Sequence, residues 1–288
     1  QPEITKKIAY AYREAGKLVV AAAEYERIEK ESKDSEVRRG ALLVAADLYE
    51  QALDTGRALE VYRRYVAAFP KPLELALESR HKIAGIYKTR NDTKAYFGEL
   101  QQIMDMDARA GRDRSDRTRF LGANAALGLT EPLYEQLTAI KLVKPFDKNL
   151  LRKKAAMKAA TDGFSKLVKY EVGDVTAAAT YYLAEIYYHF SRALTESERP
   201  DKLSAAELEQ YELAIEEQAF PFEEKAIATH QKNIELLSVG VGSLWIERSL
   251  DKLAKLVPAR YAKPEERTGY ISSIGPFRPD YITRSARP

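Results

Sequence analysis

The sequence lacks cysteine altogether, has few histidines and contains no long apolar run. With no cysteine in 288 residues, the chain cannot form disulfides, use a thiolate nucleophile or bind a metal through cysteine. No two of its three histidines lie four residues apart, the spacing of a zinc site on a helix. The longest weakly polar run, residues 40–46, is far shorter than the roughly 20 residues that span a bilayer. We therefore expect no metal ion and no transmembrane segment.

The common signatures of enzymes are also missing. The nucleophile motif Gly-x-Ser-x-Gly does not occur. The run Gly240-Val241-Gly242 lacks the third glycine and the lysine–serine pair of phosphate-binding loops, so it predicts a helix end. The adjacent carboxylates at 216–217 and 223–224 point about 100° apart on a helix and make poor acid–base pairs. The sequence predicts no enzymatic activity and no cofactor.

The overall composition is that of a folded chain with little net charge. Apolar residues make up 45% and charged residues 31%, which argues against disorder. Since 46 Lys and Arg residues face 43 Asp and Glu residues, the net charge is only +3, and nucleic acid is not expected as the main partner. The chain begins at Gln1 without an initiator methionine, which indicates a processed chain or a piece of a longer one.

A repeat of 37–38 residues is the strongest pattern in the sequence. Equivalent positions at Tyr12, Tyr49, Tyr87 and Ala125 are 37, 38 and 38 residues apart. In each copy a small residue stands three positions earlier, at Ala9, Ala46, Ala84 and Gly122. Turn-forming residues follow at Gly16, at 54–56, at 91–92 and near Gly128. Apolar residues on both sides of each turn recur three or four apart, so each copy predicts a pair of antiparallel helices.

This pattern resembles the tetratricopeptide repeat. Residues 3–70 match it best, through Tyr12, Ala21, Tyr25, Tyr49, Ala58, Tyr62 and Pro70. The spacing exceeds the 34 residues of that family, and Tyr96 and Tyr134 stand where the family has alanine. The resemblance implies an all-α fold, a right-handed superhelical solenoid of helix hairpins, with a protein–protein interaction scaffold as its function.

The organisation of the chain changes after Pro145. We expect tetratricopeptide-like repeats in residues 1–145, a divergent helical continuation in 146–257 and an extended, proline-containing tail in 258–288. In the middle part, Ser204-x-x-Glu207 predicts a helix start, and Pro221 either kinks that helix or begins a new one. The tail either docks through its aromatic residues Tyr270, Phe277 and Tyr281 or is a passive extension.

A second resemblance concerns residues 175–265. This segment is similar to the carboxy-terminal region of large exported tetratricopeptide proteins of Gram-negative bacteria, some of them associated with Tol/Ton-type or gliding-motility envelope machinery. The likeness implies a periplasmic location, with a cytoplasmic location as the alternative. It also implies a role in assembling a cell-envelope complex and association with membrane complexes through protein partners.

Two long stretches of opposite charge follow the repeats. Residues 141–170 hold nine Lys or Arg and two Asp, a net of +7, and residues 196–225 hold ten Asp or Glu and three Lys or Arg, a net of −7. These stretches could steer charged partners, order subunits head to tail, or be ordinary solvated faces. The basic stretch could also contact nucleic acid, although it has few aromatic residues for stacking and an acidic neighbour.

The resemblance also implies where a partner binds, because the first helix of each tetratricopeptide hairpin lines the concave face. Carried over position by position, the partner-contacting residues are Tyr10, Arg13, Glu14, Asp47, Glu50, Gln51, Glu78, His81, Lys88, Arg119, Tyr181, Glu185, Tyr188 and His189. Mixed charges and tyrosine rings suit a peptide or a helix as partner. The sequence thus predicts a non-enzymatic scaffold. The alternatives are a nucleic-acid-binding or regulatory solenoid that uses residues 141–170, and a helical enzyme with an unrecognised site in the groove.

Overall fold

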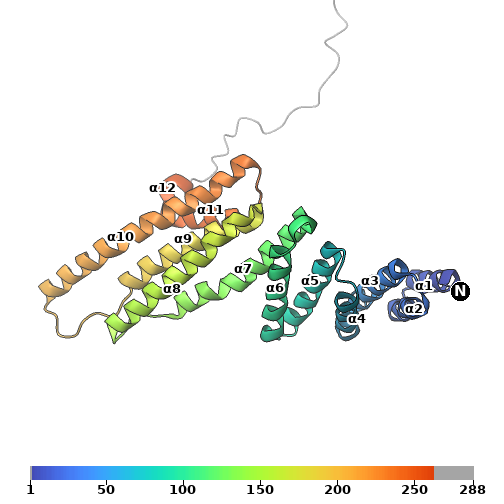
Figure 1. Ribbon diagram of the computed structural model, residues 1–288. Coiled ribbons are helices and arrows are strands. Elements are labelled where there is room, and N and C mark those ends of the chain that lie inside the picture. The colour runs from blue at the N-terminus through green and yellow to red at the C-terminus, as the bar shows by residue number, and fades with distance from the viewer. Residues whose placement is uncertain (1, 263–288) are drawn as a thin grey trace, which may run out of the picture.

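The chain is helical throughout the part that the structure describes. The computed structural model describes residues 2–262 (Figure 1). Its α-helices are α1 (Pro2–Glu14), α2 (Leu18–Glu31), α3 (Ser35–Gln51), α4 (Thr55–Ala68), α5 (Leu73–Thr89), α6 (Thr93–Ala108), α7 (Asp116–Ala139), α8 (Phe146–Leu167), α9 (Gly173–Thr195), α10 (Ala205–Glu235), α11 (Leu244–Leu256) and α12 (Pro258–Tyr261). Three short 3₁₀ segments, η1 (Gly111–Asp113), η2 (Val168–Tyr170) and η3 (Leu236–Val239), complete the described secondary structure. The all-α class is confirmed for these residues.

The helices follow one another in an elongated row. Each α-helix packs against the next one in the sequence. Figure 1 shows α1 to α6 as short helices in succession, followed by the longer helices α8, α9 and α10, which run side by side. None of the described helices has both the length and the apolar character needed to cross a membrane.

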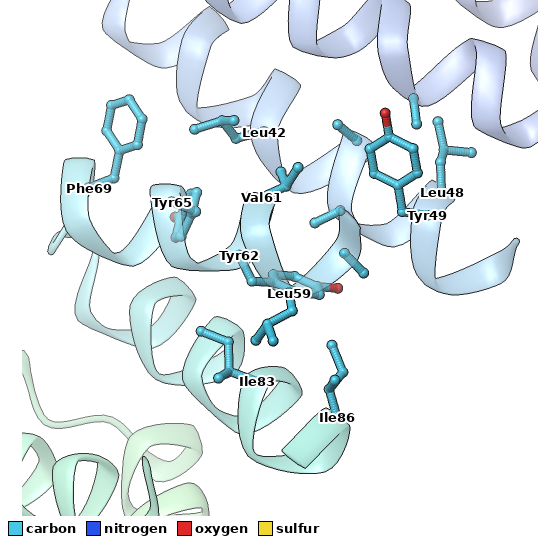
Figure 2. Close-up of a cluster of buried hydrophobic side chains, with 14 of the residues drawn as sticks. Leu42, Leu48, Tyr49, Leu59, Val61, Tyr62, Tyr65, Phe69, Ile83 and Ile86 are labelled. Atoms are coloured by element: carbon cyan, nitrogen blue, oxygen red, sulfur yellow. The ribbon is translucent and has the colours of Figure 1, made fainter. Parts of the chain in front are cut away.

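The core of the first half is built from alanine and tyrosine. Ala9, Ala46 and Ala84 are buried, as expected for positions where helices approach closely, and Tyr49 and Tyr87 cover those contacts from buried positions. Figure 2 shows side chains of α3, α4 and α5 meeting in this core, among them Leu42, Tyr49, Val61, Tyr62, Tyr65, Ile83 and Ile86. Removing this apolar surface from water is what holds successive helices together.

The turns of the first three pairs lie where the sequence predicts them. Gly16 has a φ of +71°, in the left-handed region that glycine adopts without strain. The side chain of Asp54 caps α4 by accepting a hydrogen bond from the backbone N–H of Arg57 (3.1 Å), and Asp92 caps α6 by accepting from that of Ala95 (3.1 Å).

The prediction of a turn near Gly128 is wrong. Helix α7 runs without a break from Asp116 to Ala139, so the fourth repeat is one long helix and not a hairpin. A Cβ atom on Gly128 would lie 2.9 Å from Cδ1 of Leu100 on α6, so this glycine serves close helix packing. A glycine inside a helix costs only about 1 kcal/mol, which such packing outweighs.

A tight elbow joins α6 to α7. Asp107 of α6 is buried, and its carboxylate accepts hydrogen bonds from Arg114 Nε (3.0 Å) and Nη2 (2.8 Å) and from Thr118 Oγ1 (3.2 Å). Gly122 of α7 passes so close that a Cβ atom there would lie 2.7 Å from Cβ of Asp107. The absence of a side chain at 122 is therefore a steric requirement of this joint.

The second half is organised around α9. This helix packs against α7, α8, α10 and α11. The predicted capping box is present at the start of α10, where the Ser204 hydroxyl and the Glu207 carboxylate each accept from the other residue's backbone N–H. The helix continues through Pro221, so no new helix begins there.

The predicted tail differs from the structure at its first residues. Pro258 to Tyr261 form the helical turn α12, where an extended chain was expected. The reason is that proline is well suited to the first turn of a helix. Tyr270, Phe277 and Tyr281, the predicted docking residues, lie outside the described residues.

Candidate functional site

Polar side chains join the odd-numbered helices to one another along the row. Lys82 Nζ of α5 lies 2.9 Å from Glu50 Oε2 of α3. Arg117 of α7 forms an ion pair with Glu78 of α5, and α7 packs directly on α5. Further along, Tyr182 of α9 donates a hydrogen bond to Glu131 Oε1 of α7 (3.2 Å). Helices α3, α5, α7 and α9 are therefore linked in sequence, although none of them precedes the next directly in the chain.

A pocket of about 250 Å³ opens between α5 and α7. Tyr96 and Leu100 of α6 contribute to its lining, which also comprises His81, Ala84, Gly85, Lys88, Asn124, Ala125, Leu127, Gly128 and Glu131. Lys88 Nζ lies 5.6 Å from the centre of the Tyr96 ring, within range of a cation–π contact. We call this the α5–α7 pocket. It offers both apolar surface and groups that can donate or accept hydrogen bonds.

The predicted partner-contacting residues of the first seven helices have different surroundings. His81 and Lys88 come together in the α5–α7 pocket. Glu50 and Glu78 form the links between helices, and Arg119 pairs with Asp116 of its own helix. The remaining residues of this set, Tyr10, Arg13, Glu14, Asp47 and Gln51, are all exposed. Their contact with a partner stays a prediction.

The predicted contact residues of α9 lie mostly against α10 and α11. The ring centre of Tyr181 is 5.4 Å from that of Trp245, and Lys252 Nζ is 4.0 Å from the ring centre of Tyr188. Glu185 is only 8% exposed, and its carboxylate binds Lys252 Nζ at 3.0 Å. Three of the four residues thus make their contacts within the chain. The fourth, His189, lines a second pocket together with Tyr188.

Glu185 belongs to a buried polar network that the sequence analysis missed. His230 Nε2 lies 3.2 Å from Glu185 Oε1, and His230 Nδ1 lies 3.1 Å from the hydroxyl of Ser249. Asn233 Nδ2 donates to that hydroxyl at 2.8 Å. Ser249 can donate to His230 Nδ1 while His230 Nε2 donates to the Glu185 carboxylate, whereas Oδ1 of Asn233 is buried without a hydrogen-bond partner among the described residues.

A serine, a histidine and a carboxylate are joined in the same order in acyl-transfer triads. In such a triad, however, the serine must be accessible to the substrate. Ser249 and His230 are both fully buried, and neither lines any of the pockets described here. No substrate can reach the serine oxygen in this conformation, so the network ties α9, α10 and α11 together. Its members are 45 and 19 residues apart in sequence and share no motif, so no local pattern could have found them.

The charge state of Glu185 follows from this environment. Burial alone would raise the pKa of its carboxyl group. The hydrogen bond with His230 and the nearby Lys252 ammonium act in the opposite direction and hold the pKa below its ordinary value. Glu185 is therefore a buried carboxylate that carries its charge at neutral pH.

A second pocket, of about 490 Å³, lies where the α7–α8 connection meets α9. It is lined by Thr138, Ile140, Lys141, Leu142, Val143, Lys153, Tyr188, His189, Arg192, Ala193 and Glu196. Lys153 is completely buried, and its Nζ donates to the backbone carbonyls of Leu137 (3.0 Å) and Ile140 (2.6 Å). This side chain therefore caps the C-terminal end of α7, where helices leave carbonyl groups unpaired.

Burial changes the titration of two basic side chains at this pocket, Lys153 and His189. It lowers the pKa of Lys153 to about 8. Burial also lowers the pKa of His189, and the positive charge of Lys153 lowers it further. Nδ1 of His189 is buried and has no hydrogen-bond partner among the described residues. Within residues 2–262, no three His, Cys, Asp or Glu side chains converge as a metal site would require.

Comparison with protein-family models and with curated proteins finds no match to this chain. The tetratricopeptide-like interpretation and the likeness to envelope proteins therefore stay predictions from the residues.

Proposed function

We propose that the chain is a non-enzymatic scaffold that binds a protein partner along its odd-numbered helices. In this proposal the helix pairs form a right-handed superhelical solenoid of tetratricopeptide-like units. Packing of each helix on the next supports it, since a single pair cannot bury its own apolar face. The links from α3 through α5 and α7 to α9 support a continuous face on which a partner could lie.

The observation that carries the proposal is the α5–α7 pocket. Its apolar floor can take one aliphatic or aromatic side chain of a partner. Around that floor, Lys88 and Asn124 can donate hydrogen bonds to a peptide backbone, and Glu131 can accept one. A small apolar site surrounded by mixed polar groups suits an extended peptide or an amphipathic helix, whose apolar residues anchor it while its backbone or polar face remains hydrated.

Two glycines allow a direct test of the pocket. A Cβ atom on Gly85, which lines the pocket, would meet nothing within 4 Å, so we expect Gly85→Leu to add a side chain at the pocket without a clash at its Cβ atom. A Cβ atom on Gly98 of α6 likewise meets nothing within 4 Å, but Gly98 does not line the pocket. Gly98→Leu is therefore a matched control, and both substitutions favour the helical state.

The experiment selects peptides that bind the intact protein from a displayed random library and measures their affinities for the two variants. We expect Gly85→Leu to weaken binding at least about tenfold, which corresponds to about 1.4 kcal/mol, and Gly98→Leu to leave it unchanged. Peptides that bind both variants equally well would place the binding face elsewhere. A library that yields no binder at all would remove the support for a peptide-binding scaffold.

We also propose a bacterial cell-envelope assembly, in the periplasm, as the setting. The support is the likeness of residues 175–265 to exported envelope proteins. Osmotic-shock fractionation of the source cells tests it, because a periplasmic protein is released with the shock fluid whereas a cytoplasmic one stays with the cells.

A further inference from the structure

The outer face of α8 combines an apolar strip with uncompensated positive charge. Leu151 is 69% exposed, and the exposed residues Ala155 and Ala159 continue its line at intervals of one helical turn. Exposed basic residues flank this strip at Lys148, Arg152, Lys154, Lys158 and Lys166. Two acidic residues lie on this helix: Asp162 is paired with Lys158 (2.7 Å), and the exposed Asp147 precedes Leu151 by one helical turn. We call this surface the basic face.

The outer face of α10 has the opposite charge and a similar apolar centre. Leu213 and Phe220 are 57% and 59% exposed and lie two helical turns apart. Exposed carboxylates surround them at Glu209, Glu216, Glu217 and Glu224. None of these four carboxylates forms an ion pair with any residue in the described part of the chain. We call this surface the acidic face.

The two faces cannot meet within one molecule. Helix α9 packs against both α8 and α10, and Figure 1 shows it between them. The exposed side chains of α8 and α10 therefore point away from α9, in different directions. Each face leaves charged groups unpaired and large apolar side chains in water, and its complement is present elsewhere on the same chain.

We propose that the acidic face of one copy of this chain docks on the basic face of a second copy. Phe220 and Leu213 then pack against Leu151, and the small side chains at 155 and 159 let the two helices approach closely. The glutamates of α10 lie beside the lysines and Arg152 of α8. From Glu209 to Glu224 the acidic face extends over about 22 Å, which the 22-residue helix α8, about 33 Å long, can accommodate.

A contact of this kind has a definite symmetry. Because two different faces meet, the association is heterologous. An open assembly therefore ends in one free acidic face and one free basic face. Copies therefore add head to tail, as an open chain or a closed ring. The opposite charges of the faces speed association and fix the pairing, and salt weakens it.

A second copy fits the basic face better than nucleic acid does. Binding of single strands relies on aromatic rings that stack on bases, and the exposed residues of α8 include no aromatic ring. The centre of the face is instead Leu151 with two alanines, which is a surface for another helix. An acidic face with exposed Phe220 on the same chain supplies that helix.

The test is sedimentation velocity of the full chain, with charge reversal on each face. The α8 variant carries Lys154→Glu and Lys158→Glu, and the α10 variant carries Glu216→Lys and Glu217→Lys; all four residues are exposed, and circular dichroism checks that each variant is folded. We expect the unmodified chain to associate increasingly with concentration at about 50 mM salt. Its association constant should fall at least about tenfold at about 300 mM salt, where the screening length is shorter.

The two variants distinguish this contact from any other. Each variant should be monomeric alone, because its α8 and α10 faces now carry charge of the same sign and the faces of two copies repel each other. Mixed together they should associate again, since the intact acidic face of the α8 variant meets the intact basic face of the α10 variant, and their two reversed faces also have opposite charges. A chain with all four substitutions should regain self-association.

Three results would overturn the proposal. One is an unmodified chain that stays monomeric at every concentration. Another is a mixture of variants that does not pair. The third is a monomeric chain whose Lys154 and Lys158 bind a labelled oligonucleotide, which would assign the basic face to nucleic acid. None of these results bears on the α5–α7 pocket, so this inference and the proposed function are tested separately.

Discussion

The two halves of the molecule are both helical but are held together differently. Helices α1 to α6 are 13–17 residues long and pack in pairs through alanines and tyrosines. Helices α8, α9 and α10 are 22, 23 and 31 residues long, and α9 is enclosed by its neighbours. A short helix can bury one face and leave its polar residues in water. A helix enclosed by its neighbours, such as α9, cannot leave all its polar residues in water. Glu185 of α9 is therefore buried, and its partners come from two other helices.

This difference predicts unequal costs for breaking polar contacts in the two halves. In the first half the ion pairs that link α3 to α5 and α5 to α7, Glu50 with Lys82 and Glu78 with Arg117, are partly exposed, so water can replace a lost partner. In the second half the partners are buried, and a lost partner leaves an uncompensated group behind. Three comparisons between variants, taken from the largest expected effect to the smallest, test what partnered and unpartnered polar groups contribute.

The largest effect is expected from Glu185→Ala. It leaves His230 without its acceptor and removes the carboxylate that faces Lys252, so we expect the free energy of unfolding to fall by about 3 kcal/mol. Glu78→Ala is the matched substitution in the first half, because it removes the partly exposed partner of Arg117. It should cost less than about 1 kcal/mol. Urea unfolding of both variants makes the comparison, and equal losses would contradict the contrast between the halves.

The second effect concerns pH and Lys153. In the unfolded chain a lysine has a pKa near 10.4, whereas burial lowers that of Lys153 to about 8 in the folded protein. At pH values between these two pKa values, the unfolded state binds more protons than the folded state, so the free energy of unfolding should rise with pH. We expect a rise of roughly 1–2 kcal/mol from about pH 7.5 to pH 9.5. In Lys153→Met this slope should disappear in urea titrations at the two pH values. A slope that persists in the variant would assign the effect to another group.

The smallest expected change in the free energy of unfolding comes from removing one hydroxyl group from either of two tyrosines of α4. The Tyr62 hydroxyl donates to Asp47 (2.6 Å), with Glu50 Oε2 also within reach (3.0 Å), whereas the buried Tyr65 hydroxyl has no partner among the described residues. Tyr62→Phe should therefore destabilise the protein by about 1 kcal/mol. Tyr65→Phe should cost nothing or be slightly stabilising. Thermal or urea unfolding measures both, and a larger loss for Tyr65→Phe would show that the hydroxyl contacts have been misassigned.

The repeat explains how much of the first half could be predicted from sequence. Its helix pairs depend on local signals: apolar residues on one helical face, and Gly16, Asp54 and Asp92 at the turns. The error at Gly128 shows the limit of such signals. Glycine ends a helix or lets a neighbour approach, and only the position of Leu100 decides between the two.

The second half shows why the candidate site was harder to predict. The resemblance implies that His81 and Lys88 face a partner; both line the α5–α7 pocket, and their contact with a partner stays a prediction. The resemblance implies the same for Tyr181, Glu185 and Tyr188; Glu185 is buried, whereas the two tyrosines are partly exposed and contact side chains of α10 or α11. Which face of α9 is covered depends on the tertiary packing of α10 and α11, and no spacing within α9 indicates it.

The elbow at Asp107 and Gly122 bears on how this molecule can change by mutation. A side chain at 122 would collide with Asp107, and loss of Asp107 would release Arg114 and Thr118. Neither residue can therefore be replaced first without harm. We expect descendants of this chain to inherit the bend between its two halves as one unit, while the surfaces on either side of it diversify freely.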